Sequence, residues 1–261
     1  MPRLSVDIDL TWLSCERREM AFPKINQALN GVKIKLEKYN SPINITHDKG
    51  NLKLIISKNG VGIKTEVNPI KRGGYAEPVE LELCEKAQQE FNVFCVTPVV
   101  EKGMLFGGKI CAALDRQHPR DLFDIKWLLD ESGWDDVIKK GFIFYLICGN
   151  RPIYELLFPH FADQSNVFQT QFSGMSSYPF SYKDFENTRK KLVELIHKKL
   201  TNNDKKFLLE LENGTPNWQI YDFKDFPAVK WKLRNVEKFK KEKPNEHREM
   251  LNKLENGFNV L

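Results

Sequence analysis

Two aspartates near the start of the chain have the spacing of a metal-binding pair. Asp7 and Asp9 lie in the run SVDIDLTWL, where apolar and polar residues alternate as they do in a half-buried strand. Side chains at positions i and i+2 of a strand share a face, so both carboxylates could hold Mg²⁺ or Mn²⁺, which prefer oxygen ligands. A third acid, Glu66, ends another predicted strand. Together the three acids would form a clamp for an in-line displacement at phosphorus.

The neighbours of the pair favour this interpretation. Val6, Ile8 and Leu10 are expected to bury the opposite face of the strand and to leave the acids at an accessible edge. The alternative is that these acids only face solvent at strand ends, because the D-x-D spacing often arises by chance.

A second group of charged residues lies in the run GGKICAALDRQHPRDLFDIKWLL, at 107–129. Its members are Lys109, Arg116, Arg120, Asp121 and Asp124. Lys109 and Arg116 are two helical turns apart and can share a face that holds triphosphate oxygens. Asp121 and Asp124 are neighbours on the following helix, where an aspartate could orient the lysine or assist deprotonation of an acceptor hydroxyl. The alternative is a helix-to-helix network of ion pairs that stabilises the turn between the two helices.

The composition is that of an ordinary globular protein and argues against several classes. The 261 residues are 41% hydrophobic and 29% charged, enough for one large domain or two modest ones. Five scattered cysteines without C-x-x-C spacing argue against a disulfide framework or a zinc site, and no H-x-x-x-H pair suggests a histidine-built metal site. No stretch approaches the ~18 apolar residues of a membrane span, and no signal-peptide core is present. We therefore expect a cytoplasmic protein without membrane contact.

Short strand-like runs alternate with helical ones in the first hundred residues. Strands are predicted at 4–10, 52–57, 62–67, 79–83 and 93–96. The second and third should form a hairpin, because Asn59 and Gly60 between them are a turn signal. A helical region at 16–39 contains Pro23, which is expected to split it.

From Pro98 the pattern becomes helical. Thr97 resembles a helix N-cap followed by proline, Pro119 starts another helix, and Gly133 should end it. Later helices are predicted at 134–148, 182–200, 204–211, 227–241 and 245–254, with an irregular aromatic segment at 158–179. The fold class is therefore α+β. An α/β domain at 1–97 precedes a helical domain at 98–261, whose first helices, 98–132, complete the active site.

The helical half is rich in lysine and arginine, mainly at 183–206 and 230–243. Basic residues with aromatics such as Tyr221 and Trp231 could follow a phosphate backbone and stack on an unpaired base. This favours RNA as the macromolecular acceptor. The alternative is that the lysines only form solvent-exposed helix faces.

Three motifs resemble one known family. SVDIDLTWL, the run IKTEVN at 63–68 and K-x-x-A-A-L-x-R-x-x-P-R-D-L-x-D-I from Lys109 are similar to the AbiEii/AbiGii family of nucleotidyltransferase-like toxins. These are the toxins of bacterial type IV toxin–antitoxin and abortive-infection systems, and the resemblance covers roughly residues 4–130. It implies a polymerase-β-like nucleotidyltransferase domain, with a mixed sheet and helices, followed by a C-terminal helical bundle. It also implies an NTP substrate used with Mg²⁺, an acceptor such as tRNA, and a cognate antitoxin encoded nearby.

The resemblance also implies roles for individual residues. Asp7 and Asp9 fall on the metal-binding pair, Glu66 on the third acid and Lys109 on the nucleotide-contacting lysine. The R-D-x-x-D element falls on Arg120, Asp121 and Asp124, with Asp121 as the catalytic or supporting acid.

One family feature is not found before the aspartate pair. The family has a Gly-Gly or Gly-Ser turn ten or more residues ahead of D-x-D, where a helix N-terminus binds the triphosphate. Only Met1 to Val6 precede Asp7, and the glycine pairs at 73–74 and 107–108 are expected to be a loop turn and a helix irregularity. This predicts either a start codon placed too late or a shortened member with impaired nucleotide binding, with an exposed edge or surface where a helix and strand are missing.

The leading prediction is thus a toxin that transfers a nucleotide from an NTP to RNA. The alternatives are a catalytically impaired RNA- or protein-binding module, and a transferase that modifies a protein hydroxyl.

Overall fold

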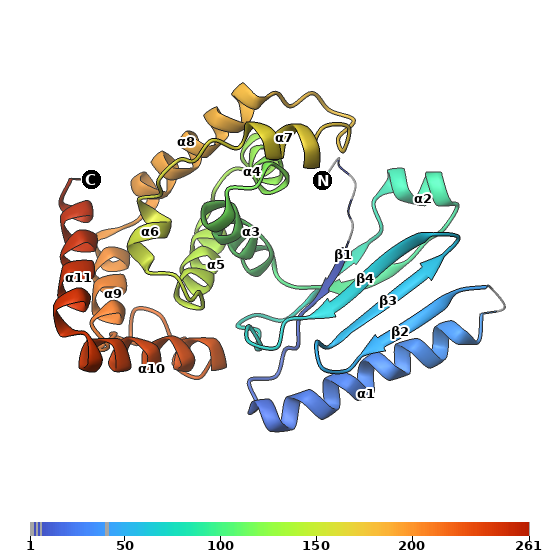
Figure 1. The fold of residues 1–261 in the computed structure, drawn as a ribbon, viewed down its shortest axis with the longest axis horizontal. Coiled ribbons are helices and arrows are strands. Elements are labelled where there is room, and N and C mark those ends of the chain that lie inside the picture. Colours follow the sequence, from blue (N-terminus) through green and yellow to red (C-terminus); the bar gives the residue numbers. More distant parts are fainter. Residues whose placement is uncertain (1–2, 4, 6, 40–41, 261) are drawn as a thin grey trace.

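The computed structural model describes Arg3, Ser5 and residues 7–39 and 42–260. A four-stranded sheet, with one long helix on one face, lies beside a larger assembly of helices (Figure 1). No helix within these described ranges is long and apolar enough to cross a membrane. The protein is therefore a mixed α and β chain whose sheet comes entirely from its first hundred residues.

The main sheet has the strand order β1-β4-β3-β2. Its strands are β1 (Asp7–Leu10), β2 (Asn44–Asp48), β3 (Lys53–Lys58) and β4 (Val61–Val67). β1 runs parallel to β4, and the other neighbours are antiparallel. The predicted hairpin is confirmed, since Asn59 and Gly60 link β3 to β4 with φ of 51° and 78°, as a type I′ turn requires. β2 was not predicted, and Leu4 and Val6 of the predicted first strand lie outside the described residues.

Helix α1 (Arg18–Glu37) covers one face of the main sheet. Ala21, Ile25 and Leu29 are buried against apolar side chains of the sheet, chiefly Leu52, Leu54 and Val67. The prediction that Pro23 splits this helix is wrong. A proline removes one N–H donor, here the one that would reach the Glu19 carbonyl, and Glu19 is exposed to water.

The predicted burial behind the aspartate pair is also wrong. Ile8 and Leu10 are 51% and 40% exposed, because α1 packs chiefly over β2 and β3. β1 is an edge strand of the main sheet among the residues that the structure describes.

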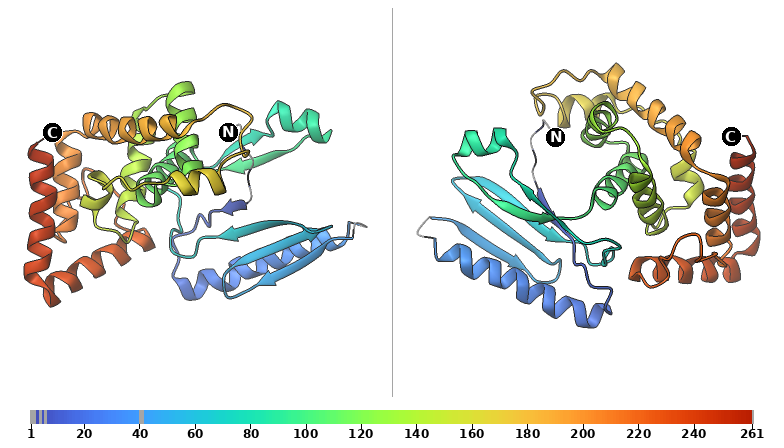
Figure 2. Two further views of the ribbon diagram at one scale, coloured as in Figure 1. Left: turned by 45° about the horizontal axis from the view of Figure 1, so that its top comes forward. Right: turned by 180° about the vertical axis from the view of Figure 1, so that it is seen from behind.

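A separate two-stranded ribbon consists of β5 (Val79–Glu82) and β6 (Val96–Val99), with the short helix α2 (Glu85–Phe91) between them. It stands apart from the main sheet (Figure 2). Pro98 therefore lies in a strand and does not begin a helix as predicted. Each strand of a two-stranded ribbon is an edge and tolerates proline, and Glu101 caps the next helix by accepting hydrogen bonds from Gly103 N and Met104 N.

The remaining chain is helical. Its helices are α3 (Lys102–Arg116), α4 (Pro119–Glu131), α5 (Asp136–Ile147), α6 (Ile153–Leu157), α7 (Ser165–Gln171), α8 (Tyr182–Lys199), α9 (Asn202–Glu212), α10 (Pro227–Glu242) and α11 (Pro244–Asn259). The helices predicted from Pro119 onward are confirmed, with shifts of a few residues at their ends. The segment predicted to be irregular holds α7, and α6 just precedes it.

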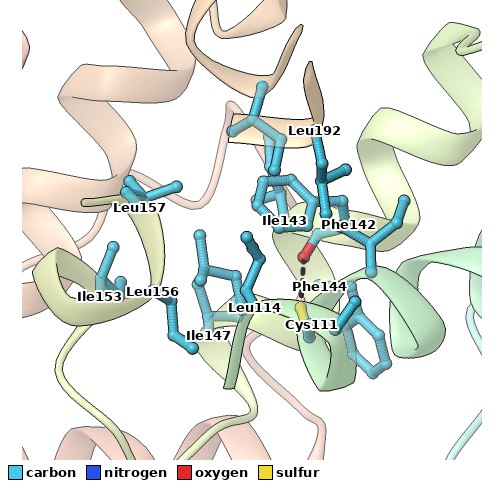
Figure 3. Close-up of a cluster of buried hydrophobic side chains, with 14 of the residues drawn as sticks. Cys111, Leu114, Phe142, Ile143, Phe144, Ile147, Ile153, Leu156, Leu157 and Leu192 are labelled. Atoms are coloured by element: carbon cyan, nitrogen blue, oxygen red, sulfur yellow. Dashed lines mark hydrogen bonds between the residues drawn. The ribbon is translucent and has the colours of Figure 1, made fainter. Parts of the chain in front are cut away.

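The main hydrophobic core lies between α3, α5 and the helices around them. Figure 3 shows Leu114, Phe142 and Ile147 in this cluster, together with Cys111, whose thiol lies 3.6 Å from the Phe142 carbonyl oxygen. The backbones of α3 and α5 touch at Gly107, because a Cβ there would collide with the backbone of Gly141. Gly107 is thus a close-contact residue in a regular helix, and the predicted helix irregularity is wrong.

Candidate active site

The three predicted metal-binding acids gather on one face of the main sheet. Where β1 and β4 run in parallel, Asp9 is paired with Glu66 and Asp7 with Lys64. Paired residues of neighbouring strands share a face, so all four side chains project from the same side. This side is opposite the face that α1 covers, which carries Leu54.

Lys64 joins two of the acids. Its Nζ lies 3.2 Å from Asp7 Oδ2 and 3.3 Å from Glu66 Oε2. Lys53 approaches only Glu66, at 3.9 Å. The hydrogen bond to Asp7 and the charge of Glu66 raise the pKa of the Lys64 ammonium. Lys64 was missed by the sequence analysis, although it is two residues from Glu66 and therefore on the same face of its strand.

Asp9 differs from its two neighbours. Partial burial raises the pKa of its carboxyl, and the charges of Glu66 and Asp7 raise it further. No hydrogen bond or ion pair to its side chain occurs among the residues that the structure describes. Lys64 and Lys109 act in the opposite direction and favour the ionised form. Asp9 is therefore the acid that would gain most from an added cation.

The chemistry of this donor set fits a divalent metal ion. Three carboxylates on one face provide the hard oxygen ligands that Mg²⁺ and Mn²⁺ use. As the side chains stand, however, no cluster of three or more His, Cys, Asp or Glu residues in the described ranges converges closely enough to hold a metal. The ammonium of Lys64 stands between Asp7 and Glu66 instead.

The Lys109-to-Asp124 run forms ion pairs between α3 and α4. Lys109 Nζ lies 2.7 Å from Asp124 Oδ2, and Arg3 Nε lies 2.7 Å from Asp124 Oδ1. Burial by itself would raise the pKa of Asp124, but the hydrogen bonds and charges of Arg3 and Lys109 lower it on balance. Arg3 was not predicted as a partner of Asp124, which lies 121 positions further along the chain.

Arg116 and Asp121 form a second pair across the turn. Arg116 donates two hydrogen bonds, Nε to Asp121 Oδ2 at 2.5 Å and Nη2 to Asp121 Oδ1 at 2.8 Å. The His118 side chain caps α4 by accepting from Arg120 N. Arg120 itself is half-buried, and no ion pair joins it within the described part of the chain. Ion pairs between α3 and α4 are thus present for four of the five charged residues, but the pairing of Arg120 with Asp121 or Asp124 that this interpretation favoured is not among the described contacts, because Arg116 and Lys109 take those carboxylates.

A cavity of about 540 Å³ connects the acids to the helices. Asp9 and Glu66 line it from the sheet, and Arg116 and Arg151 line it from the helical side. Its other polar and charged lining residues are Thr11, Asn51, Asn68, Lys71, Asp115, Tyr145 and Asn150. The hydrogen bond to Asp121 is the main cause that raises the pKa of Arg116, and the charge of Asp9 adds a smaller effect in the same direction. Lys71 and Arg151 lie in loops, where no periodic pattern marks them.

The basic helical half is less open to a polyanion than its composition suggests. Arg189 and Lys232 are buried, and Lys232 Nζ lies 2.9 Å from Glu212 Oε1. Tyr221 donates to Asp204 at 2.6 Å and packs against the core. Trp231, in contrast, is 51% exposed on α10.

Comparison with known proteins identifies the family. A family model described as the nucleotidyl transferase AbiEii toxin of the type IV TA system matches residues 1–235. Searches of curated proteins and of solved structures found no match. The family match extends the resemblance beyond residue 130 and through most of the helical half. The chain belongs to the AbiEii family of nucleotidyl transferase toxins of type IV toxin–antitoxin systems.

Proposed function

We propose that this protein transfers a nucleotide from an NTP to an RNA acceptor, with tRNA as the leading candidate, in a reaction that uses Mg²⁺ or Mn²⁺. One observation carries the proposal. Asp9 and Glu66, from neighbouring parallel strands, face a cavity whose opposite wall presents Arg116 and Arg151. Acids that hold a metal ion and arginines that hold phosphate oxygens are the two requirements of phosphoryl transfer.

The chain's own residues supply most of the chemistry. Asp7, Asp9 and Glu66 would hold the metal ion, which neutralises charge on the phosphates when bound. Arg116, Arg151 and Lys71 line the cavity and provide positive charge for the triphosphate. The acceptor hydroxyl oxygen forms a bond to the α-phosphorus, its proton is lost, and pyrophosphate leaves as the bond to the bridging oxygen breaks.

Two aspartates act through their basic partners. Asp121 fixes the guanidinium of Arg116 with two hydrogen bonds, so it is a positioning residue for a group that lines the cavity. Asp124 fixes Lys109, whose charge partly offsets the burial and the neighbouring acids that raise the pKa of Asp9. Lys109, Arg120 and Asp124 are retained as candidate nucleotide-binding residues.

This proposal keeps the predicted domain organisation. Residues 1–97 would form a polymerase-β-like nucleotidyltransferase domain, and 98–261 a helical domain. α3 and α4, within 98–132, complete the active site through Arg116 and its partner Asp121. The proposed protein partner is a cognate antitoxin of the type IV system.

Labelling of RNA tests the proposal. The protein is incubated with each α-labelled NTP in turn, with Mg²⁺ and total RNA. We expect label in RNA from at least one NTP, and its loss in the Asp7→Ala/Asp9→Ala double variant. Asp222→Ala is a matched control, because this side chain is 76% exposed and makes only a 3.9 Å ion pair with Lys224. Absence of NTP binding and RNA labelling by the folded wild type would overturn the proposal.

A second candidate function is an RNA-binding module without catalysis. The observation that favours it is that Lys109 and Arg116, the predicted phosphate-binding cations of α3, are already engaged by Asp124 and Asp121. This function predicts salt-dependent RNA binding that the aspartate substitutions leave unchanged, without labelling of RNA. The labelling experiment separates the two functions directly.

A further inference from the structure

A second cavity adjoins the one that contains Asp9 and Glu66. Its volume is about 640 Å³, within the range of cavities that bind small ligands. Asp115, Arg116 and Arg151 line both cavities, so the two spaces meet at these residues. A ligand in the second cavity would therefore lie next to whatever occupies the first.

Aromatic side chains form part of its wall. Tyr154 of α6 and Phe158, which directly follows α6, are stacked with ring centroids 5.3 Å apart and planes at 28°. Phe158 also contacts the rings of His197 and Phe258, which fix its position. Exposed or half-exposed aromatic rings at a cavity are a stacking platform for nucleic-acid bases of any sequence.

Hydrogen bonds fix another part of the cavity wall. Gln117 is buried and has a φ of 48° at the end of α3, and its amide spans two segments. Its Nε2 donates to the His160 carbonyl at 2.9 Å, and its Oε1 accepts from Arg189 Nη1 at 2.9 Å. Arg189 is buried and also donates to the Ala162 carbonyl at 2.7 Å. These bonds hold residues 160–162 in place, so the cavity is formed before any ligand arrives.

The charged residues around the two cavities differ. Lys71 lines only the first cavity, whereas Arg116 and Arg151 at the junction are paired with Asp121 and Asp115. The charged lining residues balance in each cavity, with Asp115 and Glu155 against Arg116 and Arg151 in the second, but only the first contains the acids that would hold a metal ion. A triphosphate is better placed in the first cavity, beside the metal-binding acids. The second suits a nucleoside with at most one phosphate.

Nucleotide transfer brings two substrates together at one phosphorus. We propose that the second cavity receives the unpaired 3′-terminal nucleotide of the RNA acceptor, with its base against Tyr154 and Phe158 and its ribose toward Arg116. This inference rests on the proposed function and assigns its acceptor site. It makes an unpaired 3′ end a requirement for the acceptor, because a base must leave its helix to reach the aromatic pair.

Kinetics of Tyr154→Ala test the assignment. Loss of one base-stacking partner should raise the KM for RNA about tenfold, with the KM for NTP unchanged. Tyr154→Phe keeps the ring and should remain close to wild type. Ala162→Trp, at an exposed position of the cavity wall, blocks the space without removing core packing and should have the same effect as Tyr154→Ala. Phe94→Ala is the matched control, because Phe94 is a 65% exposed aromatic outside both cavities, and Trp231→Ala tests the alternative that RNA stacks on α10.

Three kinetic outcomes would overturn the inference. A rise in the KM for NTP would show that the second cavity holds the base of the NTP. An equal loss in Trp231→Ala would place RNA on α10, and unchanged constants in both Tyr154→Ala and Ala162→Trp would exclude the cavity from binding. Label on protein in place of RNA would show a different acceptor.

A binding experiment separates this inference from the proposed function. Fluorescence anisotropy of a labelled oligoribonucleotide needs no turnover. We expect an RNA with a single-stranded 3′ end to bind at least several-fold more tightly than its blunt duplex, and Ala162→Trp to abolish the difference. If wild type transfers no nucleotide but shows this pattern, the proposed function fails and the acceptor cavity stands. If the two RNAs bind equally, the acceptor cavity fails whatever the transfer assay shows.

Discussion

Replacing Lys64 by methionine tests whether the acids of the main sheet form a cation site. Lys64 Nζ lies 3.2 Å from Asp7 Oδ2 and 3.3 Å from Glu66 Oε2. A divalent ion that used both carboxylates would have to displace this ammonium. Methionine has a similar length and no charge, so the variant should bind the metal more tightly than wild type.

The size of the effect follows from the exposure of the three side chains. Lys64, Asp7 and Glu66 are each 35% exposed, which places both ion pairs near the surface. Such pairs contribute about 0.2–1 kcal/mol each, so displacing both costs about 0.4–2 kcal/mol. The dissociation constant for the metal should therefore fall roughly two- to thirtyfold in Lys64→Met. Repulsion between an ammonium and a divalent ion acts in the same direction.

Calorimetric titration with Mn²⁺ measures this constant without turnover. Lys53→Met is the matched control, because it removes the same charge from β3 but lies 3.9 Å from Glu66 and forms no pair with Asp7. Lys64→Arg keeps the charge and should bind Mn²⁺ as wild type does. The reasoning is refuted if Lys64→Met binds Mn²⁺ no more tightly than wild type, or if Lys53→Met gains as much. Loss of binding in Asp9→Ala should confirm that the site is the one described.

Three further predictions concern the helical half. Gly107→Ala should destabilise the fold by about 3 kcal/mol or more, because its Cβ would collide with the α5 backbone. Gly108→Ala is the control, because its Cβ would lie 3.4 Å from the Tyr145 ring and should cost little stability. Thermal unfolding of the two variants compares these costs. Asp124→Asn should cost about 3 kcal/mol at pH 7. The folded-state pKa of Asp124 is below its ordinary value of 3.8, so the difference in unfolding free energy between wild type and Asp124→Asn should vanish as the pH falls through the folded-state pKa. Denaturant titrations at several pH values measure this difference. Burial raises the pKa of Cys111 to about 12 and that of Cys148 still further, so a thiol reagent at pH 8 should leave both unlabelled by mass spectrometry; labelling of either before unfolding would contradict the structure. The thiols expected to react are Cys15, Cys84 and Cys95.

The elements that could be predicted from sequence are those whose signals are local. Asn59-Gly60 specifies a tight turn by itself, and Pro119 and Gly133 mark the two ends of α4 through their own backbone preferences. The start of α3 could not be predicted in the same way. Thr97-Pro98 predicted a helix start, but pairing of β6 with the distant β5 placed both residues in a strand, and Glu101 caps α3 instead.

The candidate site was predictable in part for the same reason. The i, i+2 spacing placed Asp7 and Asp9 on one face without knowledge of the partner strand. Placing Lys64 between Asp7 and Glu66 required the register of β1 against β4, which joins residues more than fifty positions apart. Alternation within each strand could have indicated that Lys64 shares a face with Glu66, but not which strand would lie beside it.

The two interpretations of the second charged cluster are compatible once its ion pairs are considered separately. Lys109 is paired with the buried Asp124, and it is absent from the described walls of both cavities. While it is paired in this way, Lys109 contributes to packing between α3 and α4 and to the field at Asp9, and it would contact a nucleotide only on leaving Asp124. Arg116 is also paired, yet its side chain is 61% exposed and lines both cavities. A guanidinium has more donors than one carboxylate can accept, so Asp121 can fix Arg116 while other N–H groups remain for phosphate oxygens. The ion pair at the turn thus stabilises the fold and presents the arginine at the junction where the two proposed substrates meet.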